Sequence, residues 1–364
     1  LLAHYKAREE QNQMNHLLSS VVGVAALAFG LLALLLFFFF PQVAPVITKF
    51  QGETLELYIQ FGRIALLTNF LFVFGNAFGQ YLITVQRYWI YGLTPMFYTL
   101  GTILGTLYLT PLFGEFGPIY GTLGGSIIYV ILRMGGVMCA GFRPHATLWH
   151  PDLLEMGKLM LPRMVALGAL QLELLLFDTV ASGLATGSVT VNAYARNFQS
   201  VVVGIAGIAL AQSAFSLLSQ SASQREFNRF WIYLRKSVLI LLVLTIPGAV
   251  LLAFLAPVAA WLVHLSHVLP VFGTCLALYA LSIPFESINH LLLRSFYSLK
   301  HTVTPAIFSV INGTVAIAAA ALLAPTYGVY SLAIGFTAGQ IVQMVGLAVM
   351  LPRRVKRIER QVTS

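Results

Sequence analysis

Long apolar runs separated by short polar turns occupy almost the whole chain. They predict ten membrane-spanning helices, over residues 15–47, 57–86, 89–113, 117–142, 153–182, 187–219, 231–264, 268–298, 302–324 and 327–351. Most of these runs exceed the roughly 20 residues that a helix needs to cross a bilayer. Many contain Pro or Gly, which neighbouring helices can accommodate in a membrane. The pattern therefore predicts an all-α, polytopic membrane protein.

The composition supports a bilayer as the solvent. Hydrophobic residues make up 58% of the 364-residue chain and charged residues only 9%, whereas a soluble domain carries about 25% charged residues. The chain has two cysteines, Cys139 and Cys275, and both lie in apolar sequence. Two cysteines are too few for a disulfide framework or a four-cysteine zinc site, so we interpret them as reduced packing residues.

Lys and Arg concentrate on one side of the predicted topology. If the N-terminus is cytoplasmic, Lys49 alone falls on the outer side, and Arg63 and Arg196 fall inside spans. The remainder of the 21, Arg133 and Arg294 included, fall on the cytoplasmic side. This bias predicts an N-in and C-in orientation. It also accounts for the +9 net charge without a nucleic-acid partner, and we interpret the basic run 353–357 as an anchor on the anionic leaflet.

Two short motifs recur in register. Ala-Pro-Val stands at 44–46 and 256–258, and Thr-Pro at 94–95 and 304–305, with offsets that differ by two residues. Predicted helices one to four thus match seven to ten, whereas the fifth and sixth lack an upstream counterpart. Because transporters are often built from repeats, we expect two six-helix halves in parallel orientation and a chain that lacks the first two helices.

The repeat implies three parts. Residues 1–150 form a truncated N-lobe of four helices, 151–351 a C-lobe of six helices, and 352–364 a basic cytoplasmic tail.

The fifth and sixth predicted helices carry charges at membrane depth. Glu173 and Arg196 each lie about ten residues from the turn at 182–187, which places both at a depth of about 15 Å, near the middle of the bilayer core. Arg196 either contacts a ligand or pairs with Glu173 to hold two helices together. Glu286 and His290 are four residues apart, so they can touch on one helix face, as a proton relay or as a packing contact.

Several segments of the chain form recognisable motifs. They are Leu-Pro-Arg at 161–163, the turn 181–189, Tyr-Ala-Arg at 194–196 and the segment 294–305, with weaker ones at 62–64 and 87–88. Together they resemble the lipid II flippase family, MurJ/MviN, of the multidrug/oligosaccharidyl-lipid/polysaccharide flippase superfamily. The resemblance maps the chain onto family helices three to twelve. It implies a non-enzymatic flippase of the bacterial cytoplasmic (inner) membrane. Such a protein moves the undecaprenyl-pyrophosphate-linked peptidoglycan precursor between leaflets by alternating access.

The resemblance also implies a substrate site. Arg196 occupies the family's functionally important arginine position, and arginine suits a diphosphate because its fork donates hydrogen bonds in pairs. Glu173 is then its resting partner. Arg63 either lines the cavity or reaches the outer interface, and Arg163 either captures substrate or sets topology.

A Na⁺ site is a further implication of the resemblance. Asp178, Asn312 and Thr337 match its ligand positions, but Ala316 stands where a second carboxylate is expected. No resident cofactor is expected. Coupling to Na⁺, to H⁺ or to the membrane potential remains open.

Other classes fit the sequence less well. The chain has no His-Glu-x-x-His motif and no phosphate-binding GxxxxGK[ST] loop. A membrane glycosyltransferase is expected to show acidic clusters in long loops, but the predicted loops are short and basic. A flippase of another polyprenyl-linked glycan and a non-transporting scaffold remain alternatives. The expected partners are the lipid-linked precursor and membrane lipids, with the protein a monomer that can meet cell-wall synthesis proteins.

Overall fold

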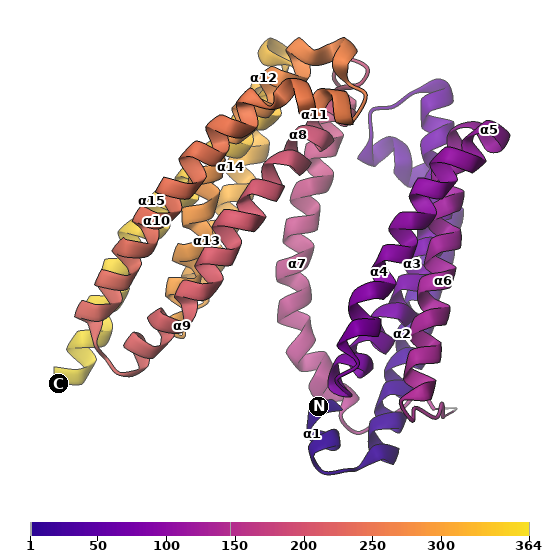
Figure 1. Ribbon diagram of the computed structural model, residues 1–364, viewed down its shortest axis with the longest axis horizontal. Coiled ribbons are helices and arrows are strands. Elements are labelled where there is room, and N and C mark those ends of the chain that lie inside the picture. Colours follow the sequence, from indigo (N-terminus) through magenta and orange to yellow (C-terminus); the bar gives the residue numbers. More distant parts are fainter. Residues whose placement is uncertain (1, 146, 364) are drawn as a thin grey trace. The chain divides into compact units, whose positions relative to one another are not determined.

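The computed structural model describes residues 2–145 and 147–363, with the side chains of residues 3, 4, 7, 158, 159, 161–163, 165–167, 169, 170 and 360–363 left aside. The described chain is built from helices and turns, without strands (Figure 1). In chain order the α-helices are α1 (Leu2–Ala7), α2 (Gln11–Ile47), α3 (Gly52–Thr84), α4 (Tyr88–Leu104), α5 (Thr110–Phe113), α6 (Gly117–Cys139), α7 (Leu153–Ser182), α8 (Ser188–Val202), α9 (Ala209–Ser223), α10 (Phe227–Phe254), α11 (Ala256–Leu262), α12 (Leu269–Ala280), α13 (Ile283–Ser298), α14 (Val303–Tyr327) and α15 (Tyr330–Thr363).

The helices confirm the predicted all-α membrane fold. Eight helical stretches among the described residues are long and apolar enough to cross a membrane, and one of these, Tyr88–Cys139, contains both α4 and α6. Each of the ten predicted spans coincides with a helical stretch in the described chain, α7 included. The helices are longer than predicted at several ends. In particular, α15 continues through the basic run, so residues 353–357 are helical.

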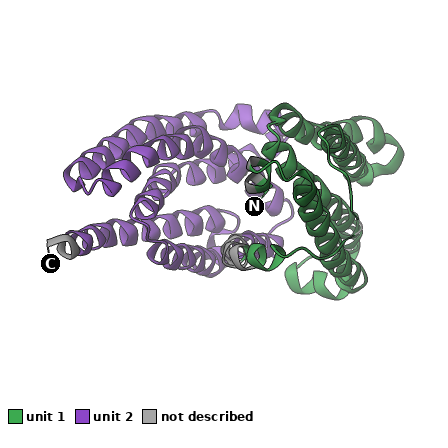
Figure 2. Cartoon of the chain, turned by 90° about the horizontal axis from the view of Figure 1, so that it is seen from below, with its two compact units in different colours: residues 1–164 green, residues 165–364 purple. Residues whose placement is uncertain are grey.

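The chain divides into two compact units, Leu1–Met164 and Val165–Ser364 (Figure 2). The division falls inside α7, fourteen residues after the sequence-based boundary at 150.

In unit 1, α3, α4 and α6 are joined by Arg133, which corrects a prediction. We expected Arg133 among the cytoplasmic charges, but it lies within α6 and is only 2% exposed. Its guanidinium donates to Thr94 Oγ1 at 2.8 Å, to the Gly75 carbonyl at 2.8 Å and to the Tyr91 carbonyl at 3.0 Å. The rings of Tyr91 and Tyr129 lie 4.7 and 4.4 Å from its guanidinium carbon. These partners offset the cost of burying the charge.

Unit 2 has two hydrophobic clusters along its helices. One, which we call the hairpin-end cluster, includes Phe177, Val191 and Phe336. The other, the basic-end cluster, includes Leu234, Leu299 and Val355. The helices α10, α13 and α15 each contribute to both clusters, so they run the length of the unit.

The hairpin of α7 and α8 turns at a glycine. Gly187 has a φ of +88°, a left-handed conformation that a residue without Cβ adopts without strain. Beyond α8 the helix widens into a π-helical segment, Val203–Ile208, before it continues as α9. Gly207 in this segment packs directly against Ser287, since a Cβ at Gly207 would overlap the serine side chain. This close approach brings the polar residues of α8 and α9 against α13.

Candidate functional site

A row of polar side chains follows one face of α13 in unit 2. Glu286, His290 and Arg294 are spaced four residues apart, so they lie above one another on the helix. Glu286 Oε1 lies 4.0 Å from His290 Nε2, which confirms that this pair can touch. We call these three residues, with Gln199 of α8 and Gln212 of α9, the polar row.

The two glutamines of the polar row connect α13 to the neighbouring α8–α9 helix. The Gln199 amide is 1% exposed and donates to Glu286 Oε2 at 2.6 Å and to Ser282 Oγ at 3.1 Å. Gln212 Oε1 accepts from Nε and Nη2 of Arg294 at 3.1 and 2.9 Å. The row therefore extends along the packed face between α13 and the α8–α9 helix.

Arg196 of α8 lies against aromatic rings. Its guanidinium carbon is 4.3 Å from the centroid of the Phe336 ring and 5.9 Å from that of Phe177, distances at which a cation is attracted to the ring face. Its Nη1 atom is buried and has no hydrogen-bond partner in the described chain. A buried guanidinium nitrogen without an acceptor is suited to bind an anionic oxygen.

The suggested ion pair between Glu173 and Arg196 is not formed. No carboxylate oxygen lies within 4.0 Å of Arg196 among the described residues, although Glu173, Asp178 and Glu286 are near enough for Coulombic interaction with it. The side chain of Glu173 instead lies beside Gly313 of α14, where a Cβ would stand 3.1 Å from Glu173 Oε2. Phe177 and Phe336 flank the guanidinium, and no described residue gives Arg196 a direct carboxylate partner.

Two of the residues matched to a Na⁺ site bond to different partners, and the third is exposed. Asn312 donates to Gln343 Oε1 at 2.8 Å, and its own Oδ1 is buried without a hydrogen-bond partner among the described residues. Thr337 Oγ1 donates to the Ala333 carbonyl at 2.9 Å, and Asp178 is exposed. Within the described residues, no group of three or more His, Cys, Asp or Glu side chains is placed to hold a metal ion.

Two further predicted arginines lie elsewhere. Arg63 of α3 is in unit 1, where its Nε donates to the Phe37 carbonyl at 3.1 Å and its guanidinium carbon lies 5.0 Å from the Phe37 ring centroid. It therefore contacts α2. Arg163 has a side chain outside the described part of the structure.

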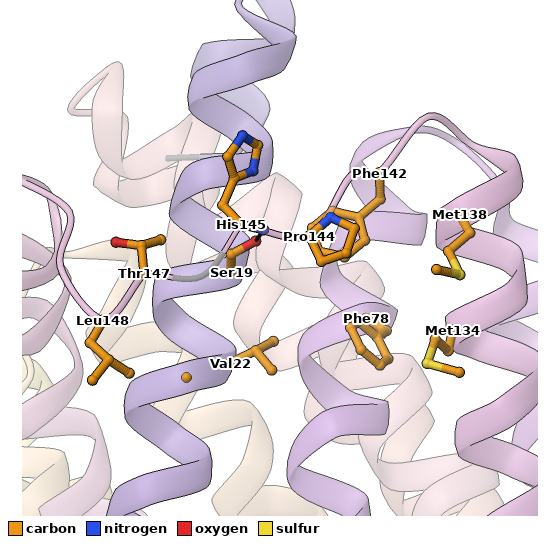
Figure 3. A pocket seen from close by; sticks show the side chains of 11 residues that line it. Ser19, Val22, Phe78, Met134, Met138, Phe142, Pro144, His145, Thr147 and Leu148 are labelled. Carbon is orange, nitrogen blue, oxygen red and sulfur yellow. Dashed lines mark hydrogen bonds between the residues drawn. The ribbon is translucent and has the colours of Figure 1, made fainter.

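Unit 1 also contains an apolar pocket of about 470 Å³. Side chains from α2, α3, α6 and the segment after α6 surround it, among them Phe78, Met134, Met138 and Leu148 (Figure 3). At its edge, the backbone N–H of His145 donates to Ser19 Oγ at 3.0 Å. The residues predicted to bind substrate or ions are not among those that line it.

Comparison with known proteins decides the family. A family model described as "Lipid II flippase MurJ" matches residues 1–363. The chain belongs to the MurJ family.

A "Probable lipid II flippase MurJ" from Rhizobium meliloti (strain 1021) is 28% identical over 206 residues, which cover 55% of this chain and 38% of that protein. One from Thermotoga maritima is 26% identical over 279 residues, which cover 75% of this chain and 56% of that protein. The chain thus spans between about two fifths and just over half of the length of these two relatives.

Solved structures share the MurJ fold with this chain. "Lipid II flippase MurJ, inward closed conformation" superposes with a TM-score of 0.82 at 22% identity, covering 98% of this chain and 78% of that one. An inward-facing multidrug resistance MATE family transporter of the MOP superfamily gives 0.85 at 14% identity, covering 99% and 85%. This is the two-lobed flippase fold that the sequence predicted.

Three members of the polar row were missing from the site predicted for this MurJ family chain. Arg294 was assigned to the cytoplasmic side, and the glutamines 199 and 212 carry no charge that marks them in an apolar run. The spacing of Glu286, His290 and Arg294 on one helix face was a readable signal for the arginine. Gln199 and Gln212 emerge only once α8 and α9 are seen against α13.

Proposed function

We propose that this chain belongs to a flippase that moves lipid II, a polyprenyl lipid carrying a diphosphate and a sugar-peptide headgroup, across the bacterial cytoplasmic membrane by alternating access. The family match over residues 1–363 and the names of the similar proteins support this substrate. The reaction makes and breaks no covalent bond, so the protein must offer the headgroup a polar path while the prenyl tail stays in lipid.

The environment of Arg196 is the observation that most directly supports the proposal. It is a charged residue in a membrane-spanning helix, and such residues usually serve a function. Its charge rests on Phe177 and Phe336, it has no ion pair in the described chain, and Nη1 has no acceptor. A phosphate oxygen would supply the missing acceptor and a compensating charge. Arg63 and Arg163 are proposed to assist, Arg163 at the cytoplasmic mouth.

We also propose a membrane topology and a driving force for this flippase. The N- and C-termini lie in the cytoplasm, since Lys49 is the single Lys or Arg assigned to the outer side. The protein acts as a monomer, without enzymatic activity, and can meet cell-wall synthesis proteins. A cation gradient or the membrane potential drives the cycle, with Asp178, Asn312 and Thr337 the proposed Na⁺ ligands.

A reconstitution experiment tests the function. Full-length protein in proteoliposomes that contain fluorescent lipid II should expose the label to a quencher or modifying enzyme on the opposite side. Arg196→Gln should abolish this exposure while the protein still inserts and folds. Arg229→Gln is the matched control, because Arg229 is exposed and pairs locally with Glu226 at 2.7 Å. Equal exposure with the wild type and with Arg196→Gln would refute the proposed role of Arg196, and no exposure with the wild type would refute the function.

A further inference from the structure

Arg294 is held in place without being neutralised. Two of its five N–H donors are directed at the neutral Gln212 Oε1, at 2.9 and 3.1 Å. A third, on Nη1, makes a long contact of 3.4 Å with the His290 carbonyl. In the part of the chain that the structure describes, Arg294 forms no ion pair with a carboxylate. Its position is therefore fixed, while its charge and at least two donors remain for a ligand.

Arg133 and Arg196 differ from Arg294 in ways that matter for an anion. Arg133 is buried, and its three donor nitrogens are already occupied. Arg196 lies among Glu173, Asp178 and Glu286, which repel an anion when they are ionised. Arg294 is partly exposed, and its hydrogen-bond acceptors are neutral. Of the three, Arg294 presents the lowest barrier to an arriving anion.

Positive charge gathers at the end of α13 that carries Arg294. Arg294 lies one turn before this end, and the loop that follows contains Lys300 and His301. Burial lowers the pKa of His301. Arg354 and Arg357 of α15 lie close enough to lower it further. The basic-end cluster packs α13 and α15 against the start of α10, and Arg225 lies just before α10. Of the acidic side chains in this region, Glu226 is paired with Arg229, and Glu359 lies further along α15. Clustered positive charge raises the local concentration of anions.

We propose that Arg294, seated by Gln212, is a capture site for the diphosphate of the lipid-linked substrate, used before the headgroup reaches Arg196. This inference rests on the proposed function. Gln212 is sixteen residues beyond Arg196 on the α8–α9 helix, which places the two sites about 24 Å apart along it. His290 and Glu286 continue the row from Arg294 along α13. The diphosphate is thus bound first near the basic end and then deeper in the helices.

The capture site predicts a specific kinetic change. In proteoliposomes of full-length protein, Arg294→Gln should raise the lipid II concentration for half-maximal transport by about tenfold, the effect of losing one or two charge-assisted hydrogen bonds. The maximal rate should be retained, because Arg196 is intact. Gln212→Glu should have the same effect, because it gives Arg294 a carboxylate that competes with the diphosphate. Arg294→Lys should restore part of the affinity, since it keeps the charge without the fork.

A binding measurement separates this inference from the proposed function. Full-length protein in nanodiscs is titrated with undecaprenyl diphosphate, and with undecaprenyl monophosphate for comparison. The wild type should prefer the diphosphate, and Arg294→Gln and Gln212→Glu should lose that preference. Arg143→Gln, a change at an exposed arginine of unit 1, should keep it. If the wild type transports lipid II and Arg294→Gln matches it in both half-saturation and binding, the capture site is wrong and the flippase function stands. If the wild type binds the diphosphate through Arg294 but transports nothing, the function fails and the anion site stands.

Discussion

The Gln199 amide donates to Glu286 Oε2 across 2.6 Å, which joins α8 to α13 within the membrane-spanning part of unit 2. The same amide also reaches Ser282 Oγ at 3.1 Å, so one side chain holds two positions on α13. Arg196 lies less than one turn before Gln199 on α8. The contact therefore orients the part of α8 that carries Arg196.

Replacement of Gln199 should destabilise unit 2. Gln199→Ala leaves an oxygen of Glu286 without its donor, and an unsatisfied buried polar group costs about 1–3 kcal/mol. We expect the Tm of the detergent-solubilised protein to fall by several degrees. Ser200→Ala, a change at the exposed neighbour, should leave Tm unaltered. An unchanged Tm in Gln199→Ala would show that this contact contributes nothing to stability.

Arg133 should be needed for folding rather than for transport. Arg133→Ala removes donors from the Gly75 and Tyr91 carbonyls and from Thr94, and we expect a loss of about 3 kcal/mol or more, with a lower Tm and poor yield. Arg196→Gln, in contrast, should keep Tm near the wild-type value while transport is lost. If Arg133→Ala folds normally and fails only in transport, Arg133 has a direct role in transport.

His150 should make the protein sensitive to acid. It lies between α6 and α7, is 1% exposed, and packs beside the Tyr5 ring and the His16 ring at centroid distances of 5.8 and 5.2 Å. Its Nδ1 accepts from the backbone N–H of Asp152 at 3.2 Å and lies 3.9 Å from Asp152 Oδ2. Its Nε2 is buried, and no described residue forms a hydrogen bond with it. Burial lowers the pKa of His150, and His16 lowers it further, although Asp152 acts in the opposite direction.

The sign of the pH effect follows from that shift. Because the folded protein holds the proton less tightly than the unfolded chain, the contribution of His150 to stability is complete above pH 6.5, its ordinary pKa, and is lost as the pH falls below that value. Thermal unfolding between pH 7.5 and 5 should show a falling Tm, and His150→Gln should reduce the slope. His301, whose pKa is also lowered, accounts for part of the remaining slope. An identical slope in His150→Gln would contradict the assignment.

The helices could be predicted from sequence because a bilayer leaves few alternatives. A backbone in lipid must satisfy its own hydrogen bonds, so long apolar runs become helices, and all ten predicted spans coincide with helical stretches in the described chain. The rise per residue predicts a mid-membrane depth for Arg196, and the stretch that carries it, Ser188–Ser223, is long and apolar enough to cross a membrane. The contact of Glu286 with His290 followed from their spacing, and it is present at 4.0 Å.

Side-chain partners across helices could not be predicted in the same way. The partners of Arg133 come from α3 and α4, up to 58 residues away, and its position near the end of a span resembled that of a loop charge. Glu173 and Arg196 have matching predicted depths, but depth does not determine which way a side chain turns around its helix. Glu173 lies beside Gly313 of α14, and Phe177 and Phe336 take the flanks of Arg196.

Glu173 is separate from Arg196 but near enough for Coulombic interaction with it. If Glu173 acts on Arg196 through space, Glu173→Gln removes a negative charge near the arginine and should tighten diphosphate binding roughly threefold or more. Gly313→Ala gives an independent test, because the added Cβ would press on Glu173 Oε2 and shift the carboxyl group without removing its charge. Gly168→Ala is the matched control, since a Cβ there meets no atom of the described residues within 4 Å. Titration of nanodisc-embedded protein with undecaprenyl diphosphate measures all three. An affinity that Glu173→Gln leaves unaltered would mean that Glu173 does not compete with the substrate for Arg196, and its place beside Gly313 would then be explained by packing alone.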